Sequence, residues 1–339
     1  MVLRLSGYFD NNFGDDYMMK IIAHKLKDIQ FIIPAEKNIC STVLEESNVK
    51  TINESCKNTP SLCITGSGFM VNSPRVLISE LKRILKGVPV EDYCLGCNIE
   101  PFSNRFYEFV MAKKLEKFKF IICRDKESFK WLKNHNRKSE IRYLPDILFS
   151  MPDEWLEKCD ENADRLGISI MNSGNSEKAQ NYYKKMADAA DYYIETTGCE
   201  VILLAFDSGE EDDVSACELV KELCKHKDKI SIVSHKYGGE IITAYNKCKK
   251  IIGTRFHSTV LALKMKIPVF PIIYRSKTKN MLDDVKFTGK RCKIDEITEK
   301  DIKDFINTAP PPFEVEDEIL KDSEKYADLF YEYLQKTER

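Results

Sequence analysis

The sequence predicts an α/β protein in which two doubly wound domains face each other across a cleft. Its 339 residues are too many for one typical hydrophobic core and fit two domains of about 150 residues each. In both halves, short apolar runs alternate with segments of helical periodicity, which is typical of parallel sheets built from βα units. The hydrophobic fraction of 43% and the charged fraction of 31% exclude a disordered or fibrous chain.

We expect the first domain to span residues 1–150. An acidic, weakly patterned connection at residues 152–164 follows it and predicts the boundary. The expected strands are Val2–Ser6, Ser61–Thr65, Val88–Leu95, Phe120–Cys123 and Ile141–Leu144. The expected helices are Asp16–Leu26, Arg75–Leu85, Asn104–Glu116 and Lys126–Asn134.

The second domain, residues 151–312, repeats the alternation. The expected strands are Leu166–Ile170, Val201–Phe206, Ile230–Val233, Ile251–Gly253 and Pro268–Ile273. The expected helices are Glu177–Thr196, Asp212–His226, Gly239–Lys247 and Ser258–Lys264. Three prolines at 310–312 break the pattern, and residues 313–339 predict one amphipathic helix that could cross back to the first domain.

The charge balance bears on the class of partner. There are 52 basic and 54 acidic residues, so the formal net charge is -2 and no global basic field exists to hold nucleic acid. No apolar run reaches the 18 or more residues of an integral membrane segment, and the N-terminus lacks a signal-peptide core. We therefore expect a cytoplasmic protein, with peripheral membrane contact and oligomeric state left open.

The twelve cysteines are scattered and often lie inside apolar runs, which predicts reduced, mostly buried thiols. Cys94 and Cys97 form a C-x-x-C, but no second pair or nearby histidine completes a zinc set. They are interpreted as core or loop residues, with metal or redox use as the alternative. We expect no metal and no cofactor.

The first candidate site follows the first strand. Gly14 permits close backbone approach, while Asn12 and Asp15 can either cap the next helix or face a ligand.

Two further strand ends carry unusual residues. Gly66, Ser67 and Gly68 follow an apolar strand and suit either an ordinary turn or a chain passing beneath a ligand. Arg124 ends another strand, where it can bind an anion or simply pair with Asp125.

The sharpest motif is Gly253-Thr254-Arg255-Phe256-His257, at the end of a buried strand. In an extended turn, Arg255 and His257 would project to the same side, which pairs a guanidinium fork with a titratable imidazole. Ser258 opens the following helix, whose free N–H groups favour an anion. Lys277, just after the next strand, could add a second cation. The alternative is a hydrogen-bonded core histidine beside a surface arginine.

Residues 207–213 are acidic but lack the ligand spacing of a calcium loop, so we interpret them as a solvated loop that leads into a helix.

Together these segments resemble the polysaccharide pyruvyl transferase family. The resemblance rests on Asn12 to Asp15, residues 65–68, Arg124 to Ser128 and Gly253 to His257 with the downstream Lys277. It implies two Rossmann-like domains in a GT-B-like arrangement with phosphoenolpyruvate as the donor substrate in the cleft. It also implies that Arg124, Arg255, His257 and Lys277 bind the donor or act in catalysis.

The implied activity adds pyruvate to a sugar as a cyclic ketal, with release of phosphate, in surface polysaccharide biosynthesis. The sugar acceptor could be nucleotide-activated or lipid-linked. Phosphoenolpyruvate carries a carboxylate and a phosphate, so convergent cations suit it. His257 is the candidate proton donor or base, and Asp15 is the candidate group that orients or deprotonates the acceptor hydroxyl. The alternatives are a GT-B glycosyltransferase that uses a nucleotide sugar and a non-catalytic anion-binding relative.

Overall fold

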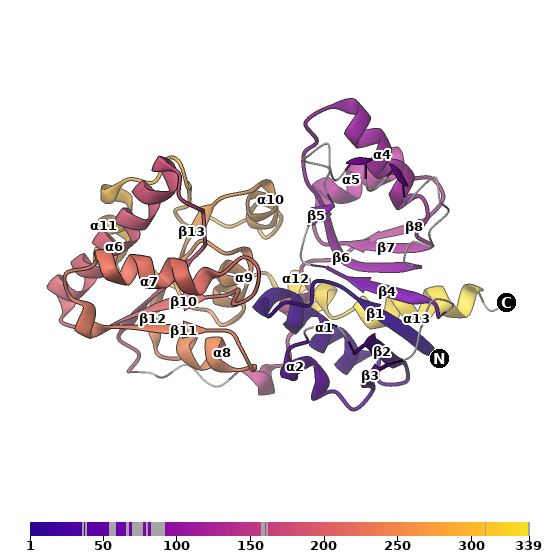
Figure 1. The fold of residues 1–339 in the computed structure, drawn as a ribbon, viewed down its shortest axis with the longest axis horizontal. Coiled ribbons are helices and arrows are strands. Elements are labelled where there is room, and N and C mark those ends of the chain that lie inside the picture. Colours follow the sequence, from indigo (N-terminus) through magenta and orange to yellow (C-terminus); the bar gives the residue numbers. More distant parts are fainter. Residues whose placement is uncertain are drawn as a thin grey trace.

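The computed structural model describes residues 1–35, 37, 39–53, 59–65, 68–69, 77–78, 81–82, 92–156, 160, 162–308 and 310–337. Within them the chain forms two parallel sheets, each flanked by helices, with the two domains side by side in Figure 1. This arrangement confirms the α/β class and the two doubly wound domains predicted from the sequence. The chain passes from one sheet to the other between Tyr143 and Arg165.

The first sheet has the strand order β3-β2-β1-β4-β6-β7-β8, and β5 pairs with β6. Every strand pair in it is parallel. Its strands are β1 Val2–Ser6, β2 Gln30–Pro34, β3 Val49–Ile52, β4 Ser61–Ile64, β5 Gly68–Phe69, β6 Tyr93–Ile99, β7 Phe120–Cys123 and β8 Glu140–Tyr143. Its helices are α1 Phe13–Lys25, α2 Ser41–Leu44, α4 Arg105–Leu115 and α5 Lys126–His135.

The second sheet has the order β11-β10-β9-β12-β13-β14 and is also parallel. Its strands are β9 Arg165–Ile170, β10 Val201–Ala205, β11 Ile230–Ser234, β12 Cys248–Gly253, β13 Val269–Ile273 and β14 Cys292–Lys293. Its helices are α6 Glu177–Thr197, α7 Asp213–Leu223, α8 Glu240–Tyr245, α9 Phe256–Lys264, α10 Ser276–Asp284 and α11 Glu299–Asn307.

Periodicity located the buried elements well and the edge elements poorly. All residues of β7 and β10 are buried, so their apolar runs were visible in the sequence. The strand expected at Val88–Leu95 overlaps the buried strand β6, Tyr93–Ile99, only at Tyr93–Leu95, and residues 88–91 lie outside the described residues. The edge strand β3 buries only Val49 fully, and neither it nor β2 was predicted. The helix expected at Arg75–Leu85 lies largely outside the described residues.

The end of the chain forms two helices, α12 Asp317–Ser323 and α13 Tyr326–Thr337, where one was expected. They return to the N-terminal domain, and in Figure 1 they appear in yellow along it. The Tyr326 hydroxyl donates to the Pro145 carbonyl at 2.9 Å. The ring of Tyr333 stacks on Phe120, with centroids 4.6 Å apart.

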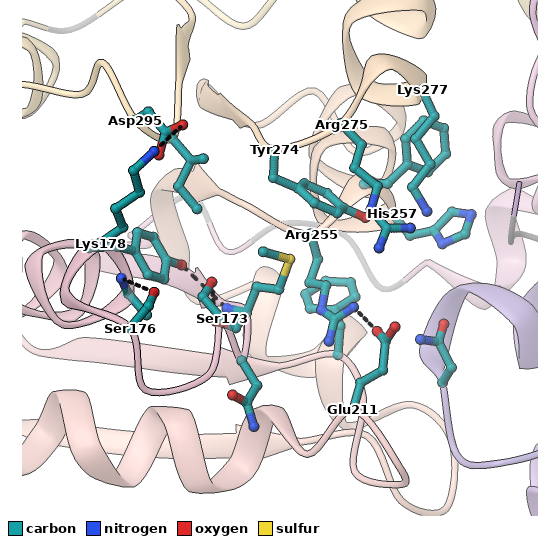
Figure 2. Close-up of a pocket in the computed structure, with 18 of the residues that line it drawn as sticks. Ser173, Ser176, Lys178, Glu211, Arg255, His257, Tyr274, Arg275, Lys277 and Asp295 are labelled. Atoms are coloured by element: carbon teal, nitrogen blue, oxygen red, sulfur yellow. Dashed lines mark hydrogen bonds and ion pairs between the residues drawn. The ribbon is translucent and has the colours of Figure 1, made fainter. Parts of the chain in front are cut away.

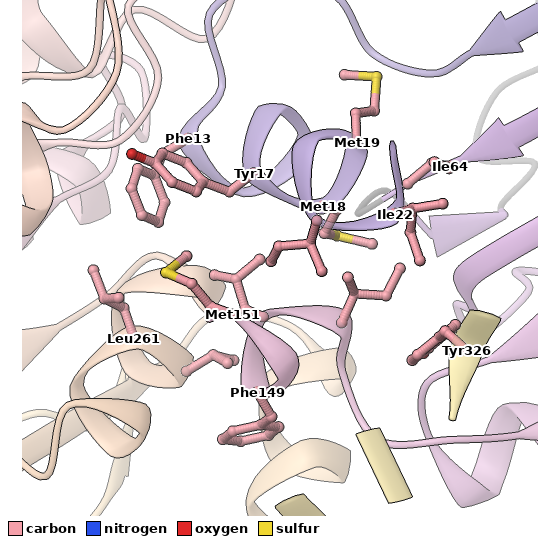
Figure 3. Packing of buried hydrophobic residues seen from close by; sticks show 14 of the residues in the cluster. Phe13, Tyr17, Met18, Met19, Ile22, Ile64, Phe149, Met151, Leu261 and Tyr326 are labelled. Carbon is pink, nitrogen blue, oxygen red and sulfur yellow. The ribbon is translucent and has the colours of Figure 1, made fainter. Parts of the chain in front are cut away.

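The domains share one hydrophobic core. A single cluster of buried residues contains Phe13 and Tyr17 of α1, Phe149 and Met151 of the connection, and Leu261 of α9, as Figure 3 shows. A shared core of this kind sets the relative position of α1 and α9, because a dry apolar interface tolerates little sliding.

A polar contact also joins the two domains. The buried His235, which follows β11, lies 2.8 Å from Asp16 of α1 through Nε2 and Oδ2.

The ten described cysteines are free, and most of them are buried. Cys94 and Cys97 lie in β6 and pack in the core, as interpreted from the sequence. No helix of the described residues combines the length and the apolar character that crossing a membrane requires.

Candidate active site

A cavity of about 450 Å³ opens where the carboxyl ends of β9, β12 and β13 face the start of α1. Ligands of doubly wound folds bind at such strand ends. Figure 2 shows the side chains that converge on it. The lining residues of the N-terminal domain include Asn12 and Asp15, and those of the C-terminal domain include Arg255, His257, Tyr274, Arg275 and Lys277.

His257 lies in the first turn of α9 and is only 7% exposed. Its Nε2 is 3.3 Å from Arg124 Nη1 and 3.8 Å from Asp146 Oδ2. Burial, and then the positive charges of Arg124, Lys277 and Arg255, hold the pKa of His257 well below its ordinary value. Because a guanidinium only donates, the contact assigns a lone pair to Nε2 and the proton to Nδ1 of a neutral imidazole.

Gly14 makes room for that imidazole. A Cβ at this position would lie 1.6 Å from His257 Nδ1 and 2.2 Å from Cε1. The ring of His257 covers the glycine in this structure, and the substrate-binding role of Gly14 stays a prediction. Its absent side chain lets α1 of one domain approach α9 of the other.

Arg124 lies behind His257, and its side chain is 1% exposed. Its Nη1 donates to Asp146 at 2.9 Å and its Nη2 donates to Asn98 at 2.8 Å. The guanidinium carbon is 4.2 Å from the centre of the Phe256 ring. Arg124 thus does pair with a carboxylate, but its partner is Asp146 and not the expected Asp125, which instead caps α5.

Arg255 points away from His257 toward a pair of carboxylates. Its Nε and Nη2 both donate to Asp213, at 2.8 and 2.5 Å, and its Nη1 donates to Glu211. Burial alone would lower the pKa of Arg255, but Asp213 and Glu211 outweigh burial and raise it. The expected extended turn stops at Arg255, the extended N-cap of α9, and His257 already lies in the helix. The two side chains therefore do not project in parallel, although both line the cavity.

The acidic loop is therefore part of the site. Asp207 and Asp213 are fully buried, so the interpretation of residues 207–213 as a solvated loop is wrong for its two ends. Glu210 and Glu211 are exposed, and the loop leads into α7 as expected. Burial raises the pKa of Asp207 to about 6, against the opposing hydrogen bond from Asn12 and the charge of Arg255. The sequence signal that could have revealed this role was the charge complementarity between the loop and Arg255.

Asn12 both caps α1 and joins the domains. Its Oδ1 accepts from the N–H groups of Gly14 and Asp15 at 3.1 and 3.3 Å. Its Nδ2 donates to Asp207 of the other domain at 2.9 Å. Asp15 is 4% exposed and lines the cavity from the first turn of α1. Asn12 therefore caps α1 and also lines the cavity, whereas Asp15 lines the cavity without capping the helix.

Lys277, in the first turn of α10, lines the cavity as predicted, with Nζ 5.6 Å from the centre of the Phe256 ring. The neighbouring Arg275 also lines it and was missed by sequence reasoning.

Two other expectations differ. Ser258 is fully buried, and its Oγ accepts from the Tyr245 hydroxyl at 3.0 Å, so it fastens α9 to the C-terminal domain and does not reach the cavity. Gly68 lies in β5 beside β6 and is not among the residues that line the cavity. Gly66 and Ser67 lie outside the described residues.

The other end of the cavity is polar and was not predicted. It is lined by the loop that joins β9 to α6 and by the start of that helix, including Asn172, Ser173, Ser176 and Lys178. Tyr182 also lines it, and its hydroxyl donates to Thr254 Oγ1 at 3.0 Å. Sequence patterns gave no signal here, because serine and asparagine after a strand are common in ordinary turns.

Solved structures with a related fold are GT-B enzymes, which confirms the predicted arrangement of the domains. The UDP-GlcNAc 2-epimerase from Rickettsia bellii superposes with a TM-score of 0.59 at 11% identity, over 99% of this chain and 96% of that one. The UDP-GlcNAc 2-epimerase from Methanocaldococcus jannaschii gives a TM-score of 0.57 at 11% identity, over 98% and 99%. At such identities the likeness shows the fold alone.

The sequence matches none of the curated proteins. The family model for polysaccharide pyruvyl transferase, however, matches residues 12–276, which includes both Asn12 at the start of α1 and Arg275 beside the cavity. The chain therefore belongs to the polysaccharide pyruvyl transferase family.

Proposed function

We propose that this protein transfers pyruvate from phosphoenolpyruvate to a sugar as a cyclic ketal, with release of phosphate. The observation that carries the proposal is the convergence of a buried neutral imidazole, His257, with Arg255, Arg275 and Lys277 on one cavity between the domains. A donor with a carboxylate and a phosphate suits a wall with several cations. Family membership supports the same chemistry.

The proposed reaction needs two proton transfers. One sugar hydroxyl adds to the carbon that bears the phosphate, and the adjacent methylene carbon takes a proton to become a methyl group. The second hydroxyl then displaces phosphate, closes the ring and gives its proton to the leaving group. The two hydroxyl protons thus end on the methyl group and on phosphate, so the reaction balances.

His257 suits the first transfer. For this step the acceptor hydroxyl replaces Arg124 Nη1 at the Nε2 lone pair, so that the neutral ring can take the hydroxyl proton. The resulting imidazolium is a strong acid because burial and Arg124 disfavour its charge. It can then protonate the methylene carbon. Asp15, across the cavity on α1, is the proposed group that orients the acceptor hydroxyl.

The cavity of about 450 Å³ is larger than a three-carbon phosphate requires, which leaves room for a sugar. We propose that the acceptor is a sugar intermediate of surface polysaccharide, either nucleotide-activated or lipid-linked. The free cysteines fit the proposed cytoplasmic location, where thiols stay reduced.

The direct test is incubation of the purified protein with phosphoenolpyruvate and a panel of nucleotide-activated and lipid-linked sugars. We expect phosphate release together with a pyruvyl increment in the mass of one sugar. His257→Ala should reduce turnover by about 10²-fold or more. The control is His226→Ala, which changes a histidine paired with Glu195 outside the cavity. Turnover by His257→Ala that matches the control would refute the role of His257.

One observation favours a second function, transfer from a nucleotide sugar. The polar end of the cavity lies at the start of the 21-residue helix α6, where backbone N–H groups favour phosphate. A thermal-shift comparison of phosphoenolpyruvate with nucleoside diphosphates separates the two functions. A ligand at 100 times its Kd adds about 2.7 kcal/mol to the free energy of unfolding. A shift with phosphoenolpyruvate but no reaction with any sugar would indicate a non-catalytic anion-binding relative.

A further inference from the structure

The two carboxylates on Arg255 differ in how firmly they are held. Asp213 has a fully buried side chain, at 0% exposure, and begins helix α7. Besides Arg255, it accepts from the backbone N–H groups of Asn172 at 2.9 Å and Asp207 at 3.1 Å. With donors from three segments around it, Asp213 is a fixed partner that orients the guanidinium.

Glu211, in contrast, is a releasable partner, as its side-chain exposure and its hydrogen bonds show. Its side chain is 52% exposed and lines the cavity. Among the described residues, its carboxylate accepts a hydrogen bond from Arg255 Nη1 alone. It lies in a turn closed by the Asp212 N–H donating to the Gly209 carbonyl at 3.1 Å, so a change of side-chain rotamer can release it without moving a strand or helix. Figure 2 shows Glu211 reaching up to Arg255 from below.

The carboxylate of Glu211 also lies among the other cations of the cavity wall. Burial alone would raise the pKa of Glu211, but Arg255, Lys277 and Arg275 outweigh burial and lower it. These three residues line the same cavity. An acidic side chain thus lies where these three cations converge.

We propose that Glu211 competes with the carboxylate of the donor for Arg255 and so sets the affinity of the site for anions. Asp213 holds the Nε and Nη2 edge of the guanidinium, and the Nη1 end serves Glu211 in the free protein and the anion in the complex. A protein whose binding-competent state is only partly populated binds more weakly by that fraction. This inference rests on the proposed function, since phosphoenolpyruvate is the donor considered.

The test is calorimetric titration of wild type, Glu211→Gln and Glu210→Gln with phosphoenolpyruvate at constant ionic strength. Glutamine keeps the size of Glu211 and removes its charge, so the Kd should fall by about 1.5- to 5-fold, the range expected for loss of a partly exposed competing ion pair. Glu210 is the matched control, because it neighbours Glu211 in the turn but does not line the cavity. Its variant should bind as the wild type does.

Weaker or unchanged binding of phosphoenolpyruvate by Glu211→Gln would overturn the inference, because it would make Glu211 a support for Arg255 and not a competitor. If phosphoenolpyruvate binds to none of the three proteins, the proposed donor is wrong. Titration of the same proteins with pyruvate and with inorganic phosphate then decides the role of Glu211. Tighter binding of either probe by Glu211→Gln alone supports competition, and equal or absent binding overturns it.

Discussion

Gly14→Ala tests whether the missing side chain at position 14 of α1 makes room for the His257 ring. The added Cβ would lie 1.6 Å from Nδ1 and 2.4 Å from Cγ, so the ring must retreat by about 2 Å to reach ordinary contact. Overpacking of this kind costs about 1–3 kcal/mol of unfolding free energy. A displacement near 1 Å at a reacting group lowers turnover by about 10²-fold. We therefore expect lower stability and activity close to that of His257→Ala.

A double-mutant cycle makes this prediction specific. Gly14 lies inside α1 and is not among the residues with positive φ, so alanine there should stabilise the helix by about 0.5–1 kcal/mol once the ring is removed. Gly14→Ala should thus destabilise the wild type and stabilise the His257→Ala protein. Urea unfolding of the four proteins measures the coupling, and Gly239→Ala is the control, since nothing lies within 4 Å of a Cβ there. An equal loss of stability in both backgrounds would refute the steric argument.

Three further predictions follow from single contacts. Asp213→Asn leaves Arg255 with one carboxylate in a buried site and should cost about 3–5 kcal/mol in urea unfolding, so a cost below about 1 kcal/mol would contradict the fixed role of Asp213. In NMR titration, the folded-state midpoint of the His257 imidazole should lie well below that of the same histidine in denaturant, which is near 6.5. A folded-state midpoint at or above about 6.5 would be inconsistent with the buried, cation-flanked ring. Because this folded-state pKa is lowered, His257 should contribute stability that is present above about pH 6.5 and is lost as the pH falls toward the folded-state pKa. Tyr326→Phe removes the hydroxyl that donates to Pro145 and should cost about 0.5–1.5 kcal/mol, while Tyr237→Phe, at a 74% exposed tyrosine, should cost nothing measurable.

The fold could be predicted further than the site. Buried strands such as β7 and β10 are continuous apolar runs, and the long helix α6 has clear periodicity, so local sequence was enough to locate them. The single final helix was wrong in detail, because α12 ends at Ser323 and α13 starts again at Tyr326. Helical periodicity continues across such a short break and conceals it.

The site depends on long-range contacts that no local pattern contains. His257 and Lys277 were predicted at the cavity and lie there, because strand ends of a doubly wound sheet converge. The pairing of Arg255 with Glu211 and Asp213 joins residues more than 40 positions apart. Likewise, the contact of Gly14 with His257 exists only because the domains share a core.

The return of α13 to the N-terminal domain has a consequence for biosynthesis. Tyr93 and Phe120 of the first sheet are covered by Phe330 and Tyr333, which the ribosome adds nearly 200 residues after the last strand of that sheet. During translation this apolar face stays open while the whole C-terminal domain is made. The N-terminal domain is therefore completed only after α13 has been made, and until then the nascent chain presents an apolar surface of the kind that chaperones recognise.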